Sequence, residues 1–124
     1  MASFTDRELD VMSVLWKLKS GTVSEVREHI ADDLAYNTVL TVLRTLEAKG
    51  HVRHEDEGKA HRYFPTVRRN DAGRSAVART LDKIFDGSAE TMLTQLVGDK
   101  ALSREKLTRL RTLIDERLAD KGGK

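Results

Sequence analysis

The 124-residue chain contains no cysteine and only one proline, and aromatic residues make up 5% of it. The lack of cysteine excludes disulfides, thiolate metal sites and cysteine nucleophiles. No apolar run approaches the roughly 18 residues of a membrane-spanning helix, and residues 1–10 are polar and mixed in charge. We therefore expect no signal sequence and a cytoplasmic location. The high share of charged residues, 34%, favours a helical protein with a large polar surface.

The net charge of +2 is too small to identify a nucleic-acid partner, so its distribution matters more. Residues 1–35 contain four Lys and Arg against seven Asp and Glu, whereas residues 36–69 contain seven against four. The second segment is thus the basic one. The split favours a nucleic-acid partner, although a scattered surface can also produce it by chance.

The segment over residues 35–50, AYNTVLTVLRTLEAKG, predicts a helix with an apolar face and an opposite face of short polar side chains. The apolar face carries Val39, Val42, Leu43 and Leu46. The polar face carries Asn37, Thr41, Arg44 and Ala48. Threonine is a poor helix former, whereas short hydroxyls with an occasional arginine suit base edges and phosphates. We interpret this segment as a DNA-recognition helix; the alternative is an ordinary exposed amphipathic helix.

Two shorter helical patterns precede this segment, and a hairpin pattern follows it. Thr5 with Glu8, and Thr22 with Glu25, have capping-box spacing, which predicts helices over about 6–19 and 22–30. After Gly50, HVRH and AHRYF predict two strands joined by the turn EDEGK. This order is typical of a winged helix-turn-helix, and we predict such a DNA-binding domain over residues 1–69.

From residue 70 onward the pattern predicts three helices without hydroxyl-rich faces, over about 71–85, around Met92 to Val97, and from a cap at Ser103. About fifty residues leave such apolar stripes half covered. We therefore predict a mostly α (α+β) protein whose residues 70–124 form a three-helix dimerisation domain. The expected interface residues are Leu81, Ile84, Phe85, Leu107, Leu110, Leu113, Ile114 and Leu118.

The polar face and the hairpin provide the predicted DNA contacts. Arg44 is the expected main base reader, because it is the only charged side chain at the centre of that face. The predicted hairpin is the wing of this fold, and the acidic residues 55–57 make its tip a poor phosphate contact. The residues expected to contact DNA are Asn37, Thr38, Leu40, Thr41, Arg44, Lys49, Lys59, His61 and Arg62. Among them, Leu40 is assigned to a thymine methyl, and the three groups Lys49, Lys59 and Arg62 to phosphates.

Catalytic and metal chemistry have no candidate in the sequence. His51 and His54 are the only close pair of histidines, and residues three apart on a strand point to opposite faces, so we predict no metal site. No Ser, His and Asp constellation stands in a glycine-rich elbow, and no phosphate-binding loop is present. We predict that the protein is not an enzyme and has no cofactor.

The segments ELDVMSVLWKLKSGTVSEV, AYNTVLTVLRTLEAKG and GKAHRYFP resemble the penicillinase-repressor family of bacterial winged-helix regulators, the BlaI, MecI and CopY group. The resemblance is strong over residues 5–69 and continues beyond them only in helical layout and length. It implies a homodimeric repressor that binds an inverted repeat in double-stranded DNA. The third helix is then expected in the major groove, with the C-terminal helices interlocked as the dimer.

The branches of this family differ in their release signal. The copper-responsive branch carries a cysteine-rich C-terminal motif, so we expect no copper sensing in a chain without cysteine. In the β-lactam branch, signalling by a membrane sensor leads to cleavage at an Asn–Phe bond, and Gln95 and Leu96 hold a similar position here, although both residues differ. The resemblance implies release by proteolysis and a membrane sensor–protease partner, with the trigger left open.

The competing hypothesis is a winged-helix protein-interaction module without sequence-specific DNA binding. The near-neutral charge and the acidic wing tip both permit it. A DNA reader differs from such a module in showing specific binding that weakens steeply with salt.

Overall fold

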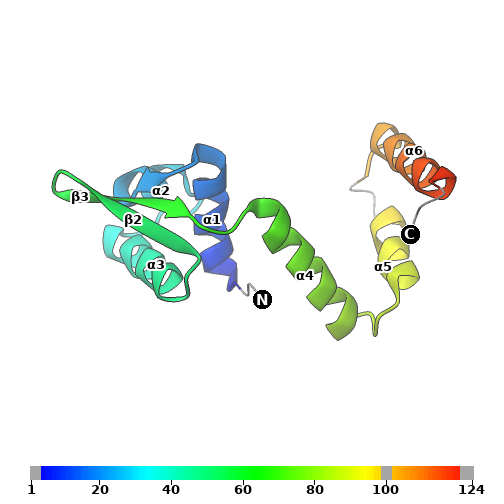
Figure 1. Ribbon diagram of the computed structural model, residues 1–124, viewed down its shortest axis with the longest axis horizontal. Coiled ribbons are helices and arrows are strands. Elements are labelled where there is room, and N and C mark those ends of the chain that lie inside the picture. Colours follow the sequence, from blue (N-terminus) through cyan, green and yellow to red (C-terminus); the bar gives the residue numbers. More distant parts are fainter. Residues whose placement is uncertain (1–3, 99–101, 121–124) are drawn as a thin grey trace. The chain divides into compact units, whose positions relative to one another are not determined.

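The computed structural model describes residues 4–98 and 102–120, and it is mostly helical with one small antiparallel sheet (Figure 1). The elements are α1 (Asp6–Leu18), β1 (Gly21–Thr22), α2 (Val23–His29), α3 (Tyr36–Ala48), β2 (Val52–Glu57), β3 (Ala60–Pro65), α4 (Arg69–Lys83), α5 (Ala89–Gly98) and α6 (Arg104–Ala119). The chain divides into two compact units, one ending at Ala78 and the other beginning at Arg79. This boundary falls within α4.

Both predicted capping boxes are present and start the first two helices. The Thr5 hydroxyl accepts a hydrogen bond from the Glu8 amide at 3.1 Å, and the Glu8 carboxylate accepts one from the Thr5 amide at 2.9 Å. Thr22 and Glu25 repeat the arrangement at the start of α2, with both distances at 3.2 Å. Four amides that the helices themselves leave without partners are thereby satisfied.

Gly50 ends α3 in a left-handed conformation, with φ of +84°. The His51 amide donates to the Leu46 carbonyl and the Gly50 amide donates to the Glu47 carbonyl, both at 2.9 Å. These two bonds form a Schellman motif, in which a glycine avoids the steric penalty that a side chain would meet. The chain is thereby turned from the helix into the first wing strand.

The sheet has the strand order β1-β3-β2, and all its pairings are antiparallel. The predicted five-residue turn EDEGK was wrong, because Glu57 pairs with Ala60 and only Gly58 and Lys59 form the turn. Gly58 has φ of +63°, which permits so tight a connection. The acidic residues 55–57 consequently belong to β2. The two-residue strand β1, which pairs with β3, is too short to leave a periodic pattern in the sequence.

The core of the N-terminal unit lies between α1, α2, α3 and the sheet. Its members are Val11, Met12, Val14, Leu15, Val23, Val26, Ile30, Val39, Leu43, Leu46, Val52 and Tyr63. Trp16 packs at the edge of this core and donates from Nε1 to the Val67 carbonyl at 2.8 Å. Leu9 of α1 lies outside this core and is 39% exposed. The buried face of α3 therefore packs against α1 and α2, which hold this helix in position.

The helices of the C-terminal unit present apolar side chains outward. Ser103 caps α6 as predicted, its hydroxyl accepting from the Lys106 amide at 3.1 Å. In the described parts of α5 and α6 no residue is buried. The predicted first helix of this region begins at Arg69 and ends at Lys83, where 71–85 was expected. No helix within residues 4–98 and 102–120 has the length and apolar character needed to cross a membrane.

Candidate nucleic-acid interface

Helix α3 separates its side chains into the two faces that its sequence predicts. Val39, Leu43 and Leu46 are fully buried. The polar side is exposed to solvent and carries Asn37, Thr38, Thr41, Arg44, Thr45 and Ala48. Leu40 is half-buried and packs against the core, so only part of its side chain is open to a ligand.

Four polar side chains on the exposed face of α3 have no polar partner among the residues that the structure describes. Within the described residues, the side chains of Asn37, Thr38, Thr41 and Arg44 make no hydrogen bond or ion pair. An unengaged guanidinium among short hydroxyl and amide groups can form the paired hydrogen bonds that distinguish base edges in a major groove. This face therefore has the chemistry of a base-reading surface.

The amino end of α3 differs from those of α1, α2 and α6, because Ala35 occupies the capping position and provides no side-chain hydrogen bond. No acidic residue lies in the first turn. The Thr38 amide donates to the Ala35 carbonyl at 3.1 Å, and the amides before it, with the positive end of the helix dipole, are available to an anion such as a phosphate. The sequence prediction missed this feature, although an alanine where the other helices have Thr or Ser was its visible signal. Tyr36, 45% exposed in the same turn, was missed as well.

Lys49, expected to bind a phosphate, lies against a carboxylate of α1. Its Nζ donates to Oε1 and Oε2 of Glu8 at 3.0 and 2.9 Å, and the Glu8 side chain is only 6% exposed. Burial raises the pKa of Glu8, but hydrogen bonds from Lys49 and from the Thr5 amide outweigh it, so the pKa lies below its ordinary value. Lys49 thus joins the end of α3 to the start of α1.

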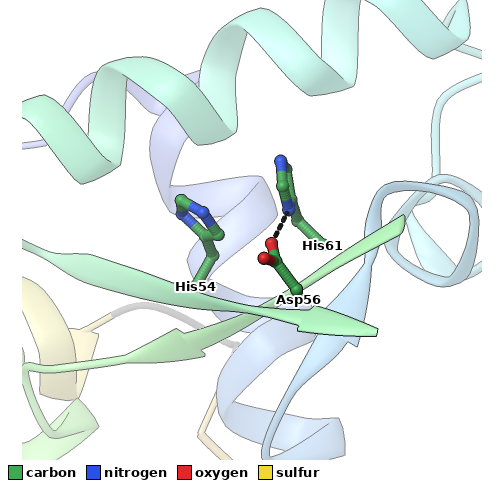
Figure 2. A group of neighbouring side chains, drawn as sticks. All are labelled: His54, Asp56 and His61. Carbon is green, nitrogen blue, oxygen red and sulfur yellow. Dashed lines mark ion pairs between the residues drawn. The ribbon is translucent and has the colours of Figure 1, made fainter. Parts of the chain in front are cut away.

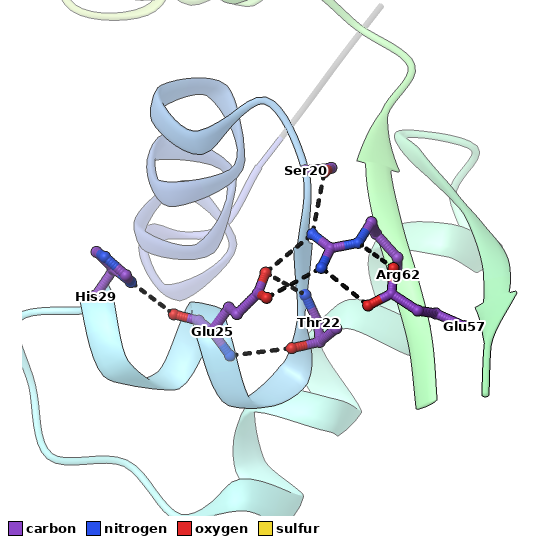
Figure 3. A network of polar contacts seen from close by, with 6 residues as sticks. All are labelled: Ser20, Thr22, Glu25, His29, Glu57 and Arg62. Carbon is purple, nitrogen blue, oxygen red and sulfur yellow. Dashed lines mark hydrogen bonds and ion pairs between the residues drawn. The ribbon is translucent and has the colours of Figure 1, made fainter. Parts of the chain in front are cut away.

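Arg62, the second expected phosphate contact, lies at the centre of a polar network (Figure 3). Its guanidinium donates to both carboxylate oxygens of Glu25 in α2, at 2.9 and 3.0 Å, and to Glu57 in β2 at 2.7 and 3.1 Å. A further bond of 3.2 Å reaches the Ser20 hydroxyl. These bonds raise the pKa of Arg62 and lower the pKa of both carboxyls. Arg62 therefore fastens the wing to α2.

The acidic residues of the wing are all matched by basic neighbours. The ion pairs are Arg53 with Glu55 at 2.7 Å, Arg62 with Glu57 at 2.7 Å, and His61, when protonated, with Asp56 at 3.0 Å. Lys59, by contrast, is exposed in the turn and makes no side-chain hydrogen bond or ion pair with any residue that the structure describes. The carboxylates at the tip of the wing are therefore neutralised by ion pairs. Lys59 is the cation of the turn that has no such pair among the described residues.

The residues predicted for a dimer interface divide into two groups. Leu81, Phe85, Leu107 and Leu110 are half-buried. The exposed members are Ile84 at 72%, Leu113 at 61%, Ile114 at 48% and Leu118 at 78%. Gln95 and Leu96 are both exposed on α5.

The sequence matches the family described as "Penicillinase repressor" over residues 4–116. The chain belongs to this family. Its members are transcriptional repressors and not enzymes, so the predictions of a repressor and of no enzymatic activity are confirmed. The family resemblance found in three segments thus extends over most of the chain.

Individual relatives agree with this assignment. The chain is 27% identical to "Penicillinase repressor" of Bacillus licheniformis over 114 residues, 90% of this chain and 89% of that protein. It is 35% identical to "Transcriptional regulator BlaI" of Mycobacterium tuberculosis over 96 residues, 74% of this chain and 70% of that protein. The solved DNA-binding domain of the repressor BlaI is similar with a TM-score of 0.51 and 32% identity, covering 56% of this chain and 87% of that one. The predicted winged-helix fold is thereby confirmed.

Proposed function

We propose that the protein is a homodimeric transcriptional repressor that binds an inverted-repeat operator through α3. The observation that carries this proposal is the solvent-facing side of α3, where Arg44, Asn37 and two threonines have no polar partner within the described residues. Polar groups that are left unengaged on one helix face suit a ligand with many donors and acceptors. Because that ligand is genomic DNA, we place the protein in the cytoplasm.

Base reading is assigned to Arg44, with Asn37, Thr38 and Thr41 as shorter partners for bases or phosphates and the open part of Leu40 against a thymine methyl. Lys59 and His61 are assigned to the DNA backbone beside the wing. Lys49 and Arg62 can reach phosphates only by leaving their carboxylates, so we assign them first to holding the recognition helix and the wing in place. Their loss is then expected to act on DNA through the shape of the interface.

The dimer is assigned to the C-terminal unit. One apolar groove of about 520 Å³ is lined by Leu102, Leu110 and Leu113 together with the stems of polar residues, and a second of about 550 Å³ by Leu113, Ile114 and Leu118. A second copy of the same unit has matching apolar side chains to fill them. Joining two reading domains makes binding of the second half-site nearly intramolecular, which raises operator affinity without new base contacts.

Release of the operator is assigned to proteolysis at Gln95 and Leu96, within a membrane sensor–protease system of the β-lactam type. The bond between these residues lies inside α5, so a protease must first find that helix locally unwound. Cleavage separates α6 from the rest of the chain. The avidity provided by the dimer is then lost, which links the cut to derepression.

The proposal is tested by electrophoretic shift of DNA from upstream of the protein's own coding region, with the full site, a half-site and scrambled DNA compared over a salt series. A dimeric reader binds the full site best, and its affinity for all DNA falls steeply with salt. Equal binding to scrambled and full sites, or none at all, overturns the proposal and favours the protein-interaction module.

A further inference from the structure

The wing gathers two imidazoles and a carboxylate on its face toward α3, as Figure 2 shows for His54, Asp56 and His61. His54 and Asp56 are two apart on β2, so their side chains share a face, and His61 pairs directly with Asp56 from β3. The sequence prediction of no metal site considered only His51 and His54. It is the register of the hairpin that brings His61 to His54, with ring centroids 4.2 Å apart.

We propose that His54, Asp56 and His61 bind one divalent transition-metal ion of the zinc class. Each offers one ligand atom, and these atoms all lie within 4.8 Å of one another. A tetrahedral site with bonds of about 2.0–2.2 Å needs its ligand atoms roughly 3.3 Å apart. The Asp56 Oδ1 to His61 Nδ1 distance of 3.0 Å is already in that range. Because all three side chains are exposed, small rotations can bring His54 into place.

A fourth residue orients one of the ligands. The carboxylate oxygens Oε2 and Oε1 of Glu47 in α3 lie 2.7 and 2.9 Å from Nδ1 of His54. A carboxylate at that nitrogen favours the tautomer with the proton on Nδ1, which leaves Nε2 with a lone pair for a metal. Carboxylate, histidine and metal in this order are the usual arrangement around zinc ligands. Glu47 is therefore a positioning residue and not a ligand.

The donor set selects the class of ion. Two imidazole nitrogens and one carboxylate oxygen suit Zn²⁺, Co²⁺ or Ni²⁺, whereas Mg²⁺ and Ca²⁺ prefer an all-oxygen shell. Three protein ligands leave the remaining position to water. The bound ion would join both wing strands and, through Glu47, the last turns of the recognition helix. Any effect on operator affinity rests on the proposed function, but ion binding itself does not.

The test is isothermal titration of the untagged full-length protein with Zn²⁺ in the absence of DNA, together with the visible absorption spectrum after Co²⁺ is added. We expect one Zn²⁺ per chain and the intense bands of tetrahedral Co²⁺. Both are expected to disappear in His61→Gln and in Asp56→Asn, and to persist in His29→Gln, which removes an exposed histidine of α2. Glu47→Gln is expected to keep the stoichiometry and weaken affinity by about 10- to 100-fold.

Circular dichroism of each variant shows whether it retains the helical fold, and only folded variants are compared. The proposal is overturned if wild-type protein shows no saturable Zn²⁺ binding, or if folded His61→Gln and Asp56→Asn bind as wild type does. It is equally overturned if His29→Gln abolishes binding. A protein that binds Zn²⁺ as expected but fails to recognise any operator leaves this site standing and removes the proposed function instead.

Discussion

The Lys49 ammonium group lies 2.9 Å from the nearly buried carboxylate of Glu8, joining residues that are 41 positions apart in the chain. Glu8 also completes the capping box at the start of α1. One carboxylate therefore begins a helix and holds the end of another. Since α3 provides the proposed base contacts, this pair fixes where the recognition helix ends relative to α1.

The substitution Lys49→Met is expected to lower the free energy of unfolding by about 1–3 kcal/mol, because the buried carboxylate loses its charged partner. Glu8→Gln is expected to cost less, since glutamine can still complete a capping box. Urea unfolding measures both. In the Glu8→Gln background, Lys49→Met should cost under about 0.5 kcal/mol. Equal costs in the two backgrounds would show that the two side chains are not coupled.

Stability should depend on pH through Glu8, whose pKa in the folded protein lies below its ordinary value of 4.5. A carboxyl with a depressed folded pKa stabilises the fold fully above its unfolded pKa, and that contribution is lost as the pH falls through the folded pKa. The difference in unfolding free energy between wild type and Glu8→Gln should be constant above about pH 5 and shrink below it. A difference that grows on acidification would reverse the assigned sign.

The helices were predictable because their signals are local. Thr5 and Glu8 are three residues apart, and so are Thr22 and Glu25, which makes each capping box visible in the sequence. Gly50 marks the end of α3 in the same way. Local rules therefore located the recognition helix and identified its exposed face.

The contacts that decide the roles of the basic residues are not local. Arg62 is 37 positions from Glu25, and Lys49 is 41 from Glu8, so no periodicity reveals that either cation is engaged. The pairing register of the two wing strands is likewise not visible in a local sequence pattern. A two-residue turn over Gly58 and Lys59 pairs His61 with Asp56, whereas the longer turn expected from EDEGK would have left Asp56 in the turn and unpaired.

Arg44→Ala is expected to weaken specific operator binding by about 1–3 kcal/mol and to relax preference at one base position. The reason is that its guanidinium is the only charged group at the centre of the exposed face of α3. Binding of a set of single-base operator variants measures both effects. Arg104→Ala removes the same charge from α6 and should leave base preference unchanged. Wild-type preference in Arg44→Ala would mean that α3 meets DNA in another orientation.

Lys59→Ala is expected to weaken binding to all DNA sequences alike and to reduce the salt slope by about one unit per chain. Its ammonium group has no ion pair with any residue the structure describes, so it is available to a phosphate. The matched variant is Arg53→Ala, which removes a wing cation that is already paired with Glu55. Its slope should change less. The same slope change in both variants would show that pairing within the wing does not decide which cation meets the DNA.

The dependence of repression on the C-terminal unit can be tested at Leu110, which lines the apolar groove of α6 with Leu102 and Leu113. If a second copy covers this groove, Leu110→Asp buries a carboxylate without a partner, a change costly enough to favour the monomer. The variant should sediment as a monomer, retain the folded N-terminal unit, and lose about 10²- to 10⁴-fold in affinity for the full operator, approaching that for a half-site.

Thr108→Asp places the same charge on an exposed position of α6 outside this groove and should remain dimeric. Leu110→Asp that still sediments as a dimer with unchanged operator affinity would move the interface elsewhere, and cleavage at Gln95 and Leu96 would then have no physical route to derepression.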